Sequence, residues 1–466
     1  MTSMNFFVFK HLFMWYTLNR GVFMKLISIC IGKLAAFLCT LIGRGSTFPG
    51  IVAEKLDKNI VKKFQMPKKV IIVTGSSGKG STTRIIANGF KDLGFSVAYN
   101  KEGGNMSYGV ITTLLKNCTL NGKIKTDVVV LEMDERSVKY VAPYINTTDM
   151  VITNITRDQP PRQRHVEFII EEIQKGITDN IHLYLNANDP ILQKFVINKK
   201  NKVTYFEINQ LKDSYKNQLF NVINNSRCPI CNSVLVYDYY HIEDIGKYKC
   251  SNKNCKFSTP KAEYNITSFE KDTIVIDKKD KITLSNDMLY SLNNTLAAYS
   301  VLCDNGLDKK KVCESISNLN RDNKIYNKYT YNNRDVYVLN NKCENAATYN
   351  QSMLYTYNDK REKTVVLGWL EISRRYLWDE LSWLYDVEFE LLKENTSCFI
   401  CTGPQAYDIA IRLKYAGIPE NKIKIHTDIY NSKEDINNSK GPIYAILNFD
   451  YLNDFNTIME GLKNEN

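Results

Sequence analysis

Residues 70 to 83 have the residue types and spacing of a phosphate-binding loop. The apolar run Val70–Val73 is typical of a buried strand, and a Gly-Ser-Ser-Gly turn and Lys79 follow it. Glycines let backbone N–H groups converge on an anion, the next helix N-terminus adds partial positive charge, and lysine adds a full one. A glycine turn with an exposed lysine is the alternative, but the flanking strand and helix favour phosphate. The predicted nucleotide-binding residues here are Gly75, Ser76, Ser77, Gly78, Lys79, Gly80 and Ser81.

A carboxylate ends the next strong apolar run. Glu132 follows Val128–Leu131, and ligands of open α/β sheets bind at the carboxyl ends of the strands. Glu132 is therefore predicted to hold Mg²⁺ beside the nucleotide phosphates, with Lys79 and Glu132 as catalytic residues. Asp134 and Glu135 are expected to lie in a solvated acidic turn.

Amide and acidic side chains follow two further apolar runs. Asn154 comes after Met150–Thr153, and Asn186 and Asp189 come after a run that begins at His182. These three residues are predicted to face the same crevice and to contact the nucleotide. Asn and Asp near 186–189 also suit a turn for purely conformational reasons.

Four of the twelve cysteines cluster between residues 228 and 255. The spacing C-x₂-C-x₁₈-C-x₄-C predicts a tetrahedral zinc site like that of a zinc ribbon. Four thiolates leave no open position, so the predicted role of the metal is structural. The predicted ligands are Cys228, Cys231, Cys250 and Cys255. The other cysteines are scattered, which favours reduced thiols and a cytoplasmic protein.

The segment 378–390 combines aromatic residues with repeated carboxylates. An amphipathic segment with a solvated acidic face and a functional segment explain this composition equally well. Residue types alone leave both open.

Alternating strand and helix patterns predict an α/β protein of about three parts. Expected strands in the central part include Ser96–Tyr99, Asn265–Phe269 and Thr273–Ile276, with helices over Ser81–Leu93, Arg162–Gly176 and Asn293–Asn305. A second α/β pattern has expected strands at Val336–Leu339, Thr364–Leu367, Ser397–Thr402, Lys422–His426 and Ile443–Leu447. The predicted divisions are 1–45, 46–322 with a cysteine-bearing insert at 222–262, and 323–466.

The chain of 466 residues carries a formal net charge of +11. A basic surface suits an anionic partner such as phosphate or acidic lipid. Aromatic and arginine residues are not interleaved, so no nucleic-acid partner is expected.

The N-terminal region has two apolar stretches, 5–16 and 26–43. Neither is an uncharged run of 18 residues, so a transmembrane helix is not expected. No small-residue cleavage site supports a signal peptide. The region is predicted to form a helix that packs on the neighbouring domain or touches the membrane interface, which permits peripheral contact with the inner face of the plasma membrane. Met24 offers an alternative start.

These motifs, in this order, resemble the Mur ligase superfamily and, more closely, its branch of ligase subunits of lipid II isoglutaminyl synthases. The resemblance runs from about Leu34 to the C-terminus. Besides the phosphate loop and the four cysteines, it rests on Gly43–Gly50, Asn105–Gly109, Leu381–Asp386 and Gly403–Gly417. It implies a Mur ligase-like central P-loop ATPase domain with a Cys₄ zinc-ribbon insert, followed by a Rossmann-like α/β C-terminal domain.

The resemblance implies ATP-dependent amidation of the D-glutamate α-carboxylate of a lipid II stem peptide. The implied cofactors are ATP, Mg²⁺ and structural Zn²⁺. The implied partner is a GatD-type class I glutamine amidotransferase subunit that releases ammonia from glutamine. An aspartate of the C-terminal domain would complete the partner's Cys–His triad, and motif position assigns this catalytic role to Asp386.

Several residues depart from the family pattern. Gly80 stands where threonine is usual, and the resemblance of the Gly-Lys-Gly-Ser stretch to folylpolyglutamate synthases implies that Ser81 takes over the Mg²⁺ contact. Pro160 and Pro161 interrupt an Asp-Gln-Leu-Asp-Arg stretch, and Glu344 replaces a lysine. Glu380 is the carboxylate that precedes the Ser-Trp pair. Two alternatives therefore stay open: a ligase of Mur or folylpolyglutamate synthase type that adds an amino acid to another carboxylate, and a non-catalytic zinc-ribbon scaffold.

Overall fold

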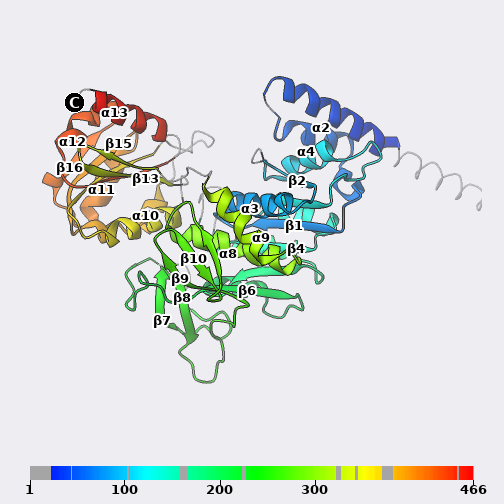
Figure 1. Cartoon of the computed structure of the whole chain (residues 1–466), viewed down its shortest axis with the longest axis horizontal. Helices are drawn as coiled ribbons and strands as arrows, with labels where there is room; N and C mark the ends of the chain where they lie inside the picture. Colours follow the sequence, from blue (N-terminus) through cyan, green and yellow to red (C-terminus); the bar gives the residue numbers. More distant parts are fainter. Residues whose placement is uncertain are drawn as a thin grey trace, which may run out of the picture.

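Two large sheets organise the protein (Figure 1). The computed structural model describes residues 23–43, 45–101, 104–157, 165–222, 227–321, 327–341, 345–369, 381–448 and 451–464. The predicted α/β class is confirmed.

The larger sheet has nine strands in the order β11-β10-β9-β6-β5-β4-β1-β3-β2. The strands from β2 to β9 in this order are parallel, whereas β9, β10 and β11 pair antiparallel. Their bounds are β1 Lys69–Thr74, β2 Val97–Tyr99, β3 Val128–Glu132, β4 Asp149–Ile152, β5 His182–Asn186, β6 Val203–Ile208, β9 Tyr264–Glu270, β10 Thr273–Ile276 and β11 Asp280–Thr283. Strands β6 and β11 were not anticipated.

Helices cover both faces of this sheet. Side chains of β1 such as Ile71 pack with α3 (Lys79–Asp92), α8 (Leu289–Asp304) and α9 (Lys309–Arg321) on one face. On the other face, Val70 and Ile72 pack with α2 (Phe48–Leu56), α4 (Ser107–Asn117), α5 (Val138–Val141) and α7 (Val166–Gln174). Both faces are buried, which explains the continuous apolar run of β1.

The smaller sheet has six strands in the order β12-β13-β17-β14-β15-β16. Helices α10 (Ala346–Asn358) and α11 (Ala406–Tyr415) cover one face, and α12 (Lys433–Asn438) and α13 (Leu452–Asn464) the other. The strands are β12 Asn327–Tyr331, β13 Arg334–Asn341, β14 Lys363–Gly368, β15 Thr396–Thr402, β16 Ile423–His426 and β17 Ile443–Asn448. All five strands expected here are confirmed, and β12 is additional.

A separate hairpin, β7 (Leu235–Ile242) and β8 (Ile245–Cys250), belongs to the cysteine-bearing insert. Short 3₁₀ helices occupy Ile60–Lys63, Ala142–Tyr144, Pro190–Phe195, Ser382–Asp386, Phe389–Leu392, Glu420–Lys422 and Ile429–Ser432.

The first described element is a helix over Phe23–Leu41, the dark blue helix at the edge of Figure 1. Its packed face contacts the central part, because Ile29 joins the apolar core formed by α2 and α4. By length and composition the helix could also cross a membrane, with 22% of its most apolar window buried. Lys33 interrupts its apolar run, and the expected packing on the neighbouring domain is present.

Candidate nucleotide site and interdomain contacts

The phosphate loop connects β1 to α3 and closes against its neighbours. Gly75 and Gly78 have φ values of +125° and +79°, which side-chain-bearing residues rarely adopt. A Cβ at Gly75 would lie 2.3 Å from Thr153 Oγ1, and one at Gly78 would lie 2.3 Å from Asn294 Oδ1. Both glycines are therefore required by conformation and by space.

Lys79 is buried within this loop. Its Nζ donates to the carbonyl oxygens of Gly75 and Ser76 and to Glu135 Oε1, the last at 2.7 Å. Glu135 and the adjacent Asp134 are themselves buried. The expectation of a solvated acidic turn was wrong, because β3 ends beside β1 and brings this turn against the loop.

Glu132 lies next to Gly80, as predicted from the strand order. A Cβ at Gly80 would be 3.1 Å from Glu132 Oε2, so any side chain at position 80 would press on the carboxylate. Glu132 Oε1 accepts a hydrogen bond from Asn105 Nδ2 at 2.9 Å. Its backbone is held by Asn100 at 2.8 Å.

The segment after β4 shapes the loop from the other side. Asn154 Oδ1 accepts from the Ser77 backbone N–H at 3.0 Å, and Asn154 Nδ2 donates to the Ser77 carbonyl oxygen at 3.1 Å. Ser76 Oγ accepts from the Thr156 backbone N–H at 2.9 Å. In this arrangement Asn154 positions the loop.

Asn186 and Asp189 end β5 and are both buried. Asn186 Nδ2 donates to Asn293 Oδ1 on α8 at 3.3 Å, so its side chain faces the side of the sheet that α8 covers. Asp189 Oδ1 caps the helix at Pro190 by accepting from the Ile191 N–H at 3.0 Å. Burial and the charge of Asp244 raise the pKa of Asp189 well above its ordinary value.

A cavity of about 230 Å³ opens beside the loop, between the two sheets. Ser77, Gly78 and Ser81 form one wall, and β13 and α10 form the opposite wall. Tyr290 and Asn294, at the start of α8, complete it. Sequence reasoning missed these two residues, although two adjacent asparagines near the start of an otherwise apolar helix were a visible signal.

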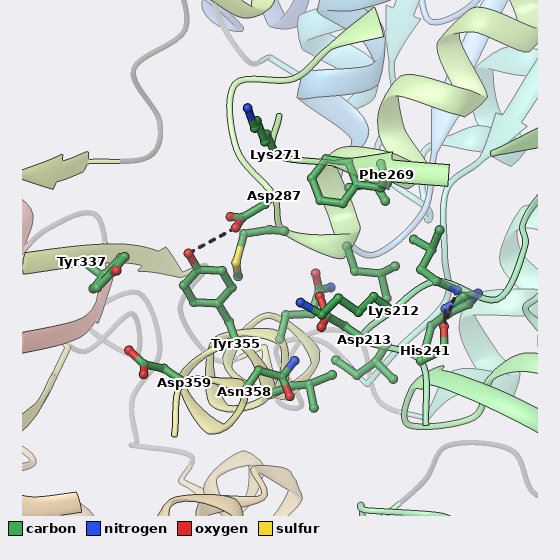
Figure 2. A pocket seen from close by; sticks show the side chains of 18 of the residues that line it. Lys212, Asp213, His241, Phe269, Lys271, Asp287, Tyr337, Tyr355, Asn358 and Asp359 are labelled. Atoms are coloured by element: carbon green, nitrogen blue, oxygen red, sulfur yellow. Dashed lines mark hydrogen bonds between the residues drawn. The ribbon is translucent and has the colours of Figure 1, made fainter. Parts of the chain in front are cut away.

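A larger cavity of about 630 Å³ adjoins it and shares Met288 and Gln351 (Figure 2). Tyr355 of α10 donates to Asp287 Oδ2 at 3.4 Å, and both residues line this cavity. Tyr337 and Tyr444 line it, and their rings stack at 4.6 Å. Residues of both units, including these aromatic side chains, therefore line this cavity.

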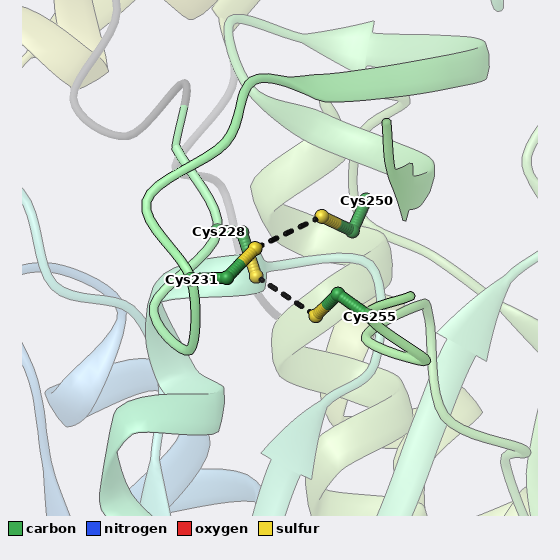
Figure 3. A group of neighbouring side chains, drawn as sticks. All are labelled: Cys228, Cys231, Cys250 and Cys255. Atoms are coloured by element: carbon green, nitrogen blue, oxygen red, sulfur yellow. Dashed lines mark hydrogen bonds between the residues drawn. The ribbon is translucent and has the colours of Figure 1, made fainter. Parts of the chain in front are cut away.

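The four predicted cysteines do come together (Figure 3). Their sulfur atoms all lie within 4.8 Å of one another, with Cys228 Sγ and Cys255 Sγ at 3.7 Å and Cys231 Sγ and Cys250 Sγ at 3.4 Å. A tetrahedral zinc with bonds of about 2.3 Å places sulfur atoms about 3.8 Å apart. The residues therefore fit a structural Zn²⁺, with all four ligand positions supplied by the protein.

We expect the purified protein to contain about one zinc ion per chain, because four thiolates saturate a tetrahedral ion. Cys255→Ser should remove most of the metal and lower the melting temperature, since metal binding contributes to folding. Elemental analysis and thermal melting measure both effects. Cys30→Ser is the matched control, because Cys30 is exposed on the N-terminal helix; full metal content in Cys255→Ser would contradict the assignment.

Asp386 lies at the end of the 3₁₀ helix Ser382–Asp386, where the second α/β unit meets the phosphate-loop side. Arg157 Nη1 donates to Asp386 Oδ2 at 2.7 Å, and Arg157 Nη2 donates to Ser382 Oγ at 2.7 Å. Burial raises the pKa of Asp386, and the Arg157 charge opposes that shift. Arg157 follows Thr156, so one short segment contacts both the phosphate loop and Asp386.

The acidic segment around Asp386 is not a solvated face. Trp383 and Glu388 are buried, and Asn221 donates to both carboxylate oxygens of Glu388 at 2.6 Å. Glu390 pairs with Arg412 at 2.9 Å. The residues of interest that lie outside the described ranges are Asp158, Gln159, Pro160, Pro161, Glu344, Trp378 and Glu380.

The tip of the β7–β8 hairpin reaches the Asp386 segment. Glu243, with φ of +47°, accepts a hydrogen bond from Asn350 Nδ2 at 2.6 Å. Asn350 also donates to the Asp386 carbonyl oxygen at 3.0 Å and accepts from the Glu388 N–H at 2.8 Å. Asn350 thereby connects the cysteine-bearing insert to the C-terminal unit, and Ile242 of the same hairpin packs into the apolar core of that unit.

Burial, with the Asp244 charge second, raises the pKa of Glu243 to about 8. Between about pH 4.5 and 8 the folded protein therefore keeps the Glu243 proton, whereas the unfolded chain has released it. The contribution of this group to the free energy of unfolding is fully present below pH 4.5 and is lost as the pH rises through 8. Glu243→Gln keeps an acceptor for Asn350 but cannot ionise. We expect it to reduce the fall in stability over this range by on the order of 1 kcal/mol per pH unit.

Urea unfolding at pH 5, 6.5 and 8 measures this dependence. Asp238→Asn, at an exposed position of the same hairpin, is the control and should leave the slope unchanged. Parallel pH profiles for Glu243→Gln and the unaltered protein would contradict the shifted pKa.

Two family profiles match the chain. Residues 73–260 match the Mur ligase middle domain, and residues 343–451 match the MurT ligase C-terminal domain. The chain is 29% identical over 431 residues to the MurT subunit of the glutamine-hydrolyzing lipid II isoglutaminyl synthase of Staphylococcus aureus (strain COL), which covers 91% of this chain and 94% of that protein. The subunit of the same name from Streptococcus pneumoniae (strain ATCC BAA-255 / R6) is 30% identical over 295 residues, which is 61% of this chain and 64% of that protein.

Solved structures share the fold. A pseudomurein peptide ligase type C from Methanothermus fervidus superposes with a TM-score of 0.62 at 21% identity, covering 87% of this chain and 81% of the other. MurF from Acinetobacter baumannii gives 0.59 at 12% identity, covering 89% and 80%. The Mur ligase-like arrangement of a central and a C-terminal unit, predicted from the motifs, is confirmed.

The sequence similarity spans both units, and the four-cysteine cluster lies inside the region that matches the middle domain. The chain therefore combines a match to the Mur ligase middle domain with a match to the MurT ligase C-terminal domain, and it is similar to MurT subunits along most of its length.

Proposed function

We propose that this chain is the ligase subunit of a glutamine-hydrolysing lipid II isoglutaminyl synthase. The observation that carries the proposal is the buried Lys79 in a glycine loop that opens on the cavity between the two units. Similarity to the two MurT subunits along most of the chain supports the substrate class. We also propose that the chain divides into three parts, with boundaries between residues 45 and 46 and between residues 322 and 323.

The proposed chemistry proceeds in two steps. The D-glutamate α-carboxylate attacks the γ-phosphorus of ATP, so that ADP leaves and an acyl phosphate forms. Ammonia then attacks the acyl carbon, phosphate leaves, and a proton is released as the amide forms. Activation is needed because a carboxylate is a poor electrophile.

The described residues support this division of labour. The loop N–H groups and Lys79 would bind and stabilise the transferring phosphoryl group, and Glu132 and Ser81 would hold Mg²⁺, which supplies further charge neutralisation when bound. Asn154 keeps the loop in shape through Ser77. Asn186 and Asp189 remain proposed nucleotide contacts at the carboxyl end of β5.

Ammonia would come from a GatD-type partner subunit. Asp386 would orient the imidazole of the partner's Cys–His pair, the role that a triad carboxylate plays. Its position at the edge of the C-terminal unit, with 20% of its side chain exposed, supports access by another protein. The proposed location is the cytoplasm, with contact at the inner face of the plasma membrane.

The test is reconstitution of the chain with its glutaminase. Given ATP, glutamine and lipid II, the pair should convert one carboxylic acid of the stem peptide to an amide, detected by mass spectrometry. The alternative function, a ligase that adds an amino acid, is tested by replacing glutamine with free amino acids or with ammonia. Phosphate release with an amino acid but not with ammonia would favour this alternative. Absence of both products would reject a ligase and favour the scaffold alternative.

A further inference from the structure

The outward face of the helix Phe23–Leu41 is apolar along nearly its whole length. Exposed positions recur every three or four residues, which is the period of one helix face. Thr40, whose hydroxyl donates to the Ala36 carbonyl oxygen at 2.8 Å, is the polar exception. The exposed apolar residues and cysteine are Phe23, Leu26, Cys30, Ile31, Leu34, Phe37, Leu38 and Leu41.

The inward face has the opposite character. Ser28, Gly32 and Ala36 are buried against the protein, and a Cβ at Gly32 would lie 2.8 Å from Leu115 Cδ1. Lys33 Nζ donates to the carbonyl oxygens of Leu115 at 2.7 Å and Cys118 at 2.8 Å. An ordinary surface helix turns its large apolar side chains inward, whereas this helix buries Ile29 but turns most of its large apolar side chains outward and is held in that orientation.

The charged residues in the sequence of the N-terminal region favour an anionic surface. The first 53 residues contain no Asp or Glu but include Lys10, Arg20, Lys25, Lys33 and Arg44. The 22 residues that precede the helix are rich in aromatic residues, including Trp15 and Tyr16. Basic residues attract acidic lipids, and Trp and Tyr concentrate at membrane interfaces.

The contacts of Lys33 favour a helix that lies flat. To cross a bilayer, the helix would have to leave α4, abandon both hydrogen bonds of Lys33 and place this charge near the bilayer centre, where it is costly. Lying in the interface keeps Lys33 bonded and buries only the outward side chains. We propose that the exposed face of Phe23–Leu41 docks the protein on the surface of an anionic lipid bilayer.

The inference deepens the proposed function, because a lipid-linked substrate would be met at that surface, but its evidence is independent of catalysis. The full chain is sedimented with vesicles of phosphatidylcholine alone or with added phosphatidylglycerol, without lipid II or ATP. The variant Leu34→Glu/Leu38→Glu places two charges on the outward face. Tyr407→Glu/Ile411→Glu is the matched control, with the same spacing on α11 and similar exposure: 61% and 51% against 57% and 52%.

We expect binding to the anionic vesicles, a loss of at least about tenfold in Leu34→Glu/Leu38→Glu, and no loss in the control. Equal binding by the variant and the unaltered chain would overturn the proposal, as would resistance to alkaline carbonate extraction, which indicates a spanning helix. If the unaltered chain forms a dimer and does not bind vesicles, and Leu34→Glu/Leu38→Glu is a monomer, the face would be assigned to contact with a second copy of the chain. Amidation of a soluble stem peptide, assayed separately, tests the proposed function whatever the vesicles show.

Discussion

Lys79→Ala is expected to lower ATP-dependent amidation by about a thousandfold, because it removes the full positive charge from the phosphoryl site. The measurement is phosphate release and amide formation with free ammonia, which bypasses the glutaminase. Lys91→Ala, in the last turn of the same helix, is the matched control and should keep full activity.

The structure adds a complication to this variant. Lys79 is paired with Glu135, whose carboxylate is also buried, and removing one partner of such a pair costs about 3–5 kcal/mol of stability. Lys79→Met/Glu135→Gln removes both charges and should fold better than Lys79→Ala while remaining inactive. Amidation by this folded double variant at the rate of the unaltered enzyme would reject the phosphate-site assignment.

Asp386→Asn is expected to lower the glutaminase rate of the partner subunit by about 10⁴-fold, because an asparagine cannot stabilise the protonated imidazole of a triad. Amidation with free ammonia should persist, since Asp386 is assigned to the ammonia-producing reaction. Glutamate release from glutamine and amidation with ammonium salts separate the two activities. Glu394→Gln, an exposed position nearby in the same unit, should change neither rate.

The contact between Arg157 and Asp386 makes this prediction informative. Arg157 is next to Thr156, which holds the phosphate loop through Ser76, so damage to this segment would impair both reactions. Loss of both activities in Asp386→Asn would therefore indicate that the aspartate supports the interdomain contact, and would reject its role in the triad.

Local signals were sufficient for the phosphate loop and the cysteine cluster. Gly75 and Gly78 sit at positive φ because the turn requires it, and this requirement is readable from spacing. Two pairs of cysteines in two turns can close one tetrahedral site, and Cys228, Cys231, Cys250 and Cys255 do gather. Strand periodicity likewise placed Glu132 at the end of β3.

Residues whose roles depend on distant partners were missed or misjudged. Glu135 was expected in solvent because an acidic turn is usually exposed, yet β1 and β3 pair and bring it to Lys79. Tyr290 and Asn294 reach the cavity only because α8 packs beside α3. No local pattern contains that information.

The amino-acid order alone predicted the α/β class, the glycine loop after β1 and the cluster of four cysteines, since each depends on spacing within one segment. The packed structure decided which charges meet, as with Arg157 and Asp386, which are 229 residues apart. It also decided which face of Phe23–Leu41 points outward, because the inward face was selected by the shape of α4 and the carbonyl groups that bind Lys33. These features depend on contacts between elements that are far apart in the sequence, and such contacts form only in the folded chain.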